Sequence, residues 1–238
     1  VPCLFRGFSA PVKYQYAYSD EQLLDIMSFA TDEFSRWDAG QTLFNKYLVS
    51  NVRALHKGQT LSLPSIFIDG FKSVLVSETL DPSLVADMFT FTSENGAREL
   101  FEVVDVDAIH EARDFMLQEI ATQLHELFVD TYLHHKQLKA YQPDINDIAI
   151  RKLKNLALTF IARVDKQLAD EYVLAQIANC NNMTDYLGAL TAANNGLLPC
   201  REAVMQAFDD KWFENGLVMD KWFALQASIP SDNALNNI

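Results

Sequence analysis

The apolar residues of this chain recur every three or four positions from about residue 19 onward, a spacing that places them on one face of an α-helix. Helix-breaking residues are rare, since the 238 residues include only 8 glycines and 7 prolines. Apolar residues make up 49% of the chain, which is enough for a substantial core. We therefore predict an all-α protein of roughly ten to twelve helices, whose short loops make neighbouring helices antiparallel.

Capping residues predict where some of these helices begin and end. The spacing of Ser35 and Asp38 is that of a capping box and predicts the start of a long helix, which Gly58 would end. Asp81 followed by Pro82 predicts another start, because aspartate caps a helix and proline fits its first position. A long amphipathic stretch over residues 105–138 predicts a packed helix. Such helix pairs form either a bundle or an α-solenoid, and no clean repeat of an ankyrin or tetratricopeptide array is visible.

Two shorter patterns stand out from the general helical spacing. Residues 1–18 contain Val12, Tyr14 and Tyr16 alternating with polar residues, which predicts the last strand of a sheet formed by segments upstream. Near the other end, Asp-Lys-Trp-Phe occurs at 210–213 and again at 220–223. We interpret this repeat as a helical hairpin whose aromatic side chains fill the core between its two arms.

The stretch HELFVDTYLHH at 125–135 begins like the zinc motif H-E-x-x-H but does not complete it. The second histidine should stand four residues after His125, about 40° round the helix, and that position is Val129. His134 lies about 180° from His125 and His135 about 80° from it. His110 begins a second near miss, which has a carboxylate in place of the second histidine. We predict no metal, cofactor or catalytic residue in this chain.

Composition excludes several other functions. The net charge of −13 disfavours nucleic acid, whose phosphates require clustered lysine and arginine. No apolar run is long enough to span a membrane, and no glycine-rich phosphate loop or serine-hydrolase elbow occurs. Cys3, Cys180 and Cys200 have no metal or redox spacing, so we expect free thiols in a reducing compartment, and the two later cysteines to lie in the core.

Several segments together resemble the bacterial aminopeptidase N family of zinc exopeptidases. They are VPCLFRGFSAPVK (1–13), FSRWDAGQ (34–41), LSLP (61–64), NNMTD (181–185), LPCREAVM (198–205) and FDDKWFENGLVMDKWFALQAS (208–228). The resemblance implies that residues 1–18 close an upstream β-sandwich domain. It also implies that residues 19–238 are the first part of a C-terminal all-α domain, an irregular superhelix of paired helices like an ARM or HEAT solenoid.

In that family zinc and the catalytic motifs H-E-x-x-H and G-x-M-E-N lie upstream, and neither motif occurs in this chain. The resemblance therefore implies an inactive cytoplasmic segment that caps the catalytic cleft and shapes the access of peptides. Its partners would be the catalytic and β-sandwich domains of the same protein. Two alternatives remain, an independent α-solenoid that binds peptides or proteins, and a small metalloenzyme using His110, His125, His134 or His135. A shortened helical domain would also expose apolar surface near residue 238, so we expect self-association or a loosely ordered C-terminal end.

Overall fold

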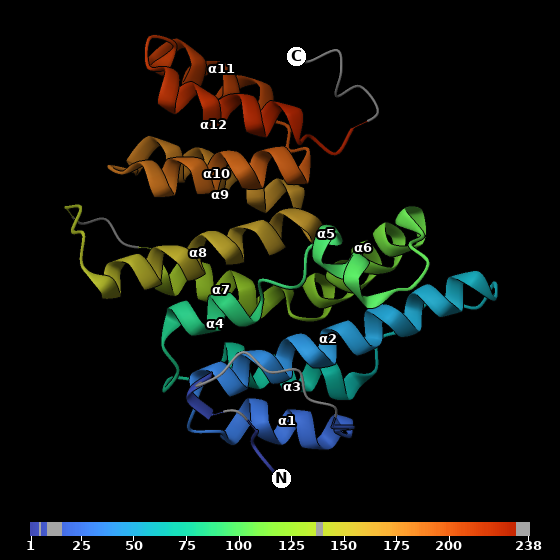
Figure 1. The fold of residues 1–238 in the computed structure, drawn as a ribbon. Coiled ribbons are helices and arrows are strands. Elements are labelled where there is room, and N and C mark those ends of the chain that lie inside the picture. Colours follow the sequence, from blue (N-terminus) through green and yellow to red (C-terminus); the bar gives the residue numbers. More distant parts are fainter. Residues whose placement is uncertain (5, 9–15, 137–139, 232–238) are drawn as a thin grey trace. The chain divides into compact units, whose positions relative to one another are not determined.

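A computed structural model describes residues 1–4, 6–8, 16–136 and 140–231. These residues form twelve α-helices and two short 3-10 helices, and none of them lies in a strand (Figure 1). The all-α class predicted from the sequence is thereby confirmed. The elements are η1 (Arg6–Phe8), α1 (Asp20–Phe29), α2 (Glu33–His56), α3 (Ser65–Leu75), α4 (Pro82–Met88), α5 (Glu94–Ala97), η2 (Arg98–Leu100), α6 (Val106–Gln123), α7 (His125–His135), α8 (Ile145–Val164), α9 (Lys166–Asn179), α10 (Met183–Gly196), α11 (Arg201–Trp212) and α12 (Gly216–Ala227).

The chain divides into two compact units, Val1–Leu124 and His125–Ile238. In the first unit α2 packs against α1, α4 and α6, and α3 packs against α1. In the second unit α8 packs against α7, α9 and α10, while α11 and α12 form a pair that contacts α10 (Figure 1). Within the ranges that the structure describes, no helix combines the length and apolar character that a membrane crossing needs.

The long second helix begins one turn earlier than the sequence predicted. Asp32 is its N-cap: the backbone there is extended, and the carboxylate accepts hydrogen bonds from the backbone N–H of Ser35 at 2.9 Å and from its hydroxyl at 2.6 Å. Ser35 is therefore bound to the cap and is not the cap itself, so the predicted capping box of Ser35 and Asp38 is wrong. The predicted end is confirmed, since Gly58 follows the helix with a φ of 63°, which glycine adopts without strain.

The amphipathic stretch at 105–138 contains two helices where the sequence suggested one. Leu124 ends α6 with φ −108° and ψ 14°, and its backbone N–H still bonds the carbonyl oxygen of Ile120. His125 then begins α7. The apolar stripe runs through both helices, since Leu117 and Phe128 are buried. Its helical spacing therefore did not reveal the break.

The repeated Asp-Lys-Trp-Phe segments do lie on a helical pair, α11 and α12, and Asn215 caps the second helix. Their phenylalanines do not fill the core between the arms, however, because Phe213 is 65% exposed and Phe223 is 56% exposed. The indole of Trp222 packs more closely and donates a hydrogen bond to the carbonyl oxygen of Met205 at 3.0 Å. The predicted aromatic core is therefore wrong for the two phenylalanines.

The predicted strand falls largely outside the described residues. Val12 and Tyr14 are not among them, and Tyr16, which is, has no regular secondary structure. The strand and the proposed domain boundary after residue 18 therefore stay predictions.

Candidate functional site

The histidines considered as zinc ligands make separate contacts. In the first unit, Nδ1 of His110 lies 2.8 Å from a carboxylate oxygen of Glu94. In the second unit, Nε2 of His125 is buried and has no hydrogen-bond partner among the described residues. The rings of His134 and His135 meet edge to face, with their centres 4.9 Å apart. Among the described residues, no group of three or more histidine, cysteine, aspartate or glutamate side chains is arranged to hold a metal ion.

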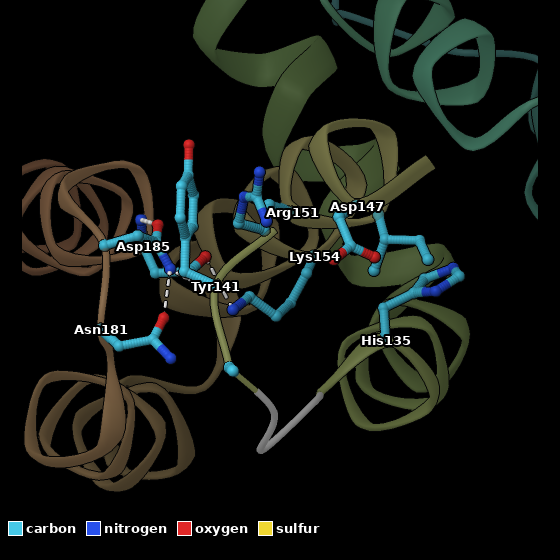
Figure 2. A pocket seen from close by; sticks show the side chains of 10 residues that line it. His135, Tyr141, Asp147, Arg151, Lys154, Asn181 and Asp185 are labelled. Atoms are coloured by element: carbon cyan, nitrogen blue, oxygen red, sulfur yellow. Dashed lines mark hydrogen bonds and ion pairs between the residues drawn. The ribbon is translucent and has the colours of Figure 1, made fainter. Parts of the chain in front are cut away.

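Several charged side chains line a small pocket in the second unit (Figure 2). Helix α8 contributes Asp147, Arg151 and Lys154 from one face, because residues three and four positions apart lie together on a helix. Tyr141 lies in the segment before α8, and Asp185 approaches from α10.

Two of the residues that line this pocket form a buried ion pair. Nζ of Lys154 lies 2.8 Å from Oδ1 of Asp185, and their side chains are only 7% and 11% exposed. Asn155 donates to the same oxygen at 3.2 Å, and Asn182 donates to the other oxygen at 3.0 Å. Asn182 also caps α10, which places Asp185 in the first turn, where the helix dipole favours an acidic residue. This carboxylate is thus well satisfied, and removing its lysine would leave an uncompensated buried charge that costs about 3–5 kcal/mol.

The polar contacts continue away from the pocket through Gln176 of α9. Its amide nitrogen donates to Oδ1 of Asn155 at 2.8 Å and to the backbone carbonyl oxygen of Asp185 at 2.8 Å. Its amide oxygen accepts from the hydroxyl of Tyr132 at 3.2 Å. Burial, followed by the charges of Tyr172 and Asp185, raises the pKa of Tyr132, so this phenol stays a protonated donor at neutral pH. The network therefore joins α7, α8, α9 and α10.

Arg151 is the least satisfied member of the cluster. It is 9% exposed, and its guanidinium carbon lies 5.0 Å from the centre of the Tyr141 ring. Within the described part of the chain, its two terminal nitrogens donate to the carbonyl oxygen of Gln142, at 3.4 and 3.3 Å. The Nε atom is buried and has no hydrogen-bond partner in the described part of the chain. His135 of α7 and Asp147 of α8 line the same pocket. The contacts described above order the helices, and we assign no reaction to them.

Comparison with known proteins shows which family has this helical architecture. The model of a protein family described as "Domain of unknown function (DUF3458_C) ARM repeats" matches residues 20–238. The chain belongs to this family. The ARM-repeat description agrees with the paired helices of both units and confirms the predicted solenoid class.

Curated relatives of this DUF3458_C chain are bacterial aminopeptidases. The chain is 46% identical over all 238 residues to aminopeptidase N of Escherichia coli and 41% identical over 238 residues to that of Haemophilus influenzae. It spans only 27% of the length of each. A crystal structure of Legionella pneumophila aminopeptidase A in complex with aspartic acid has the same fold, with a TM-score of 0.83 at 22% identity over 98% of this chain and 28% of that one.

Of the residues that line the small pocket, sequence reasoning considered His135, as a possible zinc ligand, and did not select Arg151, Lys154 or Asp185. The segment NNMTD contains Asn182 and Asp185 and was notable only for its family resemblance. An asparagine three residues before an aspartate is a signal for a helix N-terminus, which the structure confirms. The same signal does not predict that Lys154 pairs with Asp185, because the pairing depends on how α8 packs against α10.

Proposed function

We propose that this chain is a non-catalytic, C-terminal helical segment of a zinc-dependent aminopeptidase, and that it caps the catalytic cleft and shapes the access of peptides. The observation that carries the proposal is the extent of similarity: every residue aligns with aminopeptidase N, yet the alignment takes up about a quarter of that enzyme. A stack of paired helices provides a broad wall and needs no catalytic side chains.

Zinc belongs to the proposal only through the rest of the enzyme. A catalytic zinc site needs three protein ligands round one ion. The histidines of α7 do not supply them, because His134 and His135 lie near the end of the helix that His125 begins. The residues that the structure describes therefore do not fit the metal, and we assign no step of peptide hydrolysis to them. The proposed partners are the catalytic and β-sandwich domains of the same cytoplasmic protein.

Deleting the segment from the longer aminopeptidase tests the proposed role. Hydrolysis of a leucyl anilide and of peptides of increasing length would be compared with and without residues 19–238. We expect the intact enzyme to discriminate against long peptides and the deleted form to lose that discrimination while it still cleaves the anilide. An unchanged length profile in an active, zinc-loaded deletion variant would refute the capping role. A point variant that disturbs only the helical stack, Gly188→Ala, provides the second comparison should the deletion inactivate the enzyme.

A further inference from the structure

A second cavity lies where the α9–α10 loop meets the end of α11, and its volume is about 310 Å³. This volume lies within the range of sites that hold small molecules. Its apolar walls come from Met183, Tyr186 and Trp212, and Cys180 also lines it. The sequence predicted that Cys180 is a core residue, and the structure corrects this because the side chain is only partly buried and lines a cavity.

The ammonium group of Lys211 also lines this cavity. Nζ of Lys211 is 5.6 Å from the centre of the Tyr186 ring and 5.1 Å from the centre of the Trp212 ring. Ammonium groups are attracted to aromatic faces, so the two rings hold Lys211 at the cavity. Among the described residues, no carboxylate forms an ion pair with it. The positive charge at this cavity is therefore not neutralised by an ion pair.

The combination of aromatic walls and one ammonium group defines what the cavity can bind. The rings suit a flat apolar group, and the ammonium suits a single negative charge placed at its edge. A phosphate carries more charge than one lysine balances, and the chain's net charge of −13 opposes polyanions at long range. The side-chain amide of Asn182, at the same cavity, is a further polar group beside the loop.

We propose that this cavity binds small carboxylates with an apolar or aromatic body, the body lying on Tyr186 and Trp212 and the carboxylate meeting Lys211. The ligand is either a free organic acid or the C-terminal residue of a peptide, which present the same chemistry. This inference does not rest on the proposed function, because it concerns binding and requires no peptidase activity.

The test follows the indole N–H resonances of the chain by nuclear magnetic resonance during titration with phenylacetate at constant ionic strength. The chain contains three tryptophans, and a Trp212→Phe variant assigns the resonance of the cavity. We expect the Trp212 resonance to shift and to saturate at millimolar phenylacetate. The resonance of Trp222, whose N–H donates to the carbonyl oxygen of Met205, should not shift. Acetate and the neutral amide phenylacetamide should each bind at least tenfold more weakly than phenylacetate.

The two Asp-Lys-Trp-Phe segments provide a matched pair of variants. Lys211→Met keeps the side-chain stem and removes the charge at the cavity, whereas Lys221→Met does the same in the second copy, away from the residues that line it. We expect Lys211→Met to weaken phenylacetate binding at least tenfold without weakening phenylacetamide, and Lys221→Met to change neither. N-acetyl-alanyl-phenylalanine that binds more tightly than phenylacetate would identify a peptide end as the ligand, and weaker binding would identify a free acid. Absence of a saturable Trp212 shift, or unchanged phenylacetate binding by Lys211→Met, would overturn the proposal.

Discussion

Gly188 on α10 lies directly against the side chain of Asn155 on α8, and this contact allows a sharp test of the packing between the two helices. A Cβ atom added at Gly188 would stand 2.4 Å from Cγ of Asn155 and 2.7 Å from each of its amide atoms. These distances are far below van der Waals contact, so a Gly188→Ala substitution must displace Asn155.

The displacement removes two hydrogen bonds of the buried network. Asn155 donates to Asp185 at 3.2 Å and accepts from Gln176 at 2.8 Å, and both partners are buried. Leaving a buried polar group unsatisfied costs about 1–3 kcal/mol, although Asp185 keeps the bonds from Lys154 and Asn182. Alanine favours the helix over glycine by about 1 kcal/mol, which offsets part of the loss. We therefore expect a net loss of up to about 2 kcal/mol in the free energy of unfolding.

Urea unfolding followed by far-ultraviolet circular dichroism measures this loss. Gly216→Ala is the matched control, since no atom lies within 4 Å of its added Cβ and the glycine is also helical; its stability should be unchanged or slightly higher. In an Asn155→Ala background the same Gly188→Ala change should cost much less, because the clash is gone. A Gly188→Ala protein that is more stable than the parent by about 1 kcal/mol, the gain that helix propensity alone supplies, would refute the described contact between α8 and α10.

Three further predictions concern side chains outside this contact. Burial, helped by a neighbouring aspartate, raises the pKa of Cys200 to about 12, so at pH 8 this thiol should react with Ellman's reagent far more slowly than Cys3, and equal rates in the folded protein would contradict its placement. Burial, followed by the charge of the adjacent His134, lowers the pKa of His135 below its usual 6.5. The stability that the neutral His135 contributes is therefore present above pH 6.5 and is lost as the pH falls through the lowered pKa. His135→Asn should flatten the acid side of a plot of unfolding free energy against pH, and an unaltered plot would show that His135 does not cause the acid loss. Leu217 is 82% exposed and Phe223 is also exposed, so the wild-type chain should self-associate in sedimentation runs at high concentration. A variant carrying both Leu217→Lys and Phe223→Lys should self-associate less. A wild type that stays monomeric would show that this surface does not drive association.

The helical architecture could be predicted from the sequence because it depends on local signals. Asp81 with Pro82 begins a helix, as the chemistry of these residues indicates, and Gly58 ends one. The start of α2 was misplaced because Asp32 and Ser35 are both good capping residues within one turn. Only the extended backbone at Asp32 identifies the true cap.

The ion pair of Lys154 and Asp185 and the exposure of the phenylalanines of the α11–α12 pair could not be predicted in the same way. Both depend on which helices become neighbours. Lys154 and Asp185 are 31 positions apart, and the sequence around either residue does not predict that the other is its partner. The exposure of Phe213 and Phe223 has the same origin, since an aromatic residue on a helix is buried only if another element covers that face.

We propose that this chain is a helical part of an aminopeptidase and not the part that cleaves peptides. The most direct test is to purify the 238-residue chain free of host peptidases, measure its bound zinc, and assay release of amino acids from leucyl and lysyl anilides and short peptides. We predict less than stoichiometric zinc and no release above background, with or without added metal. Stoichiometric zinc together with sustained, chelator-sensitive release would contradict the account.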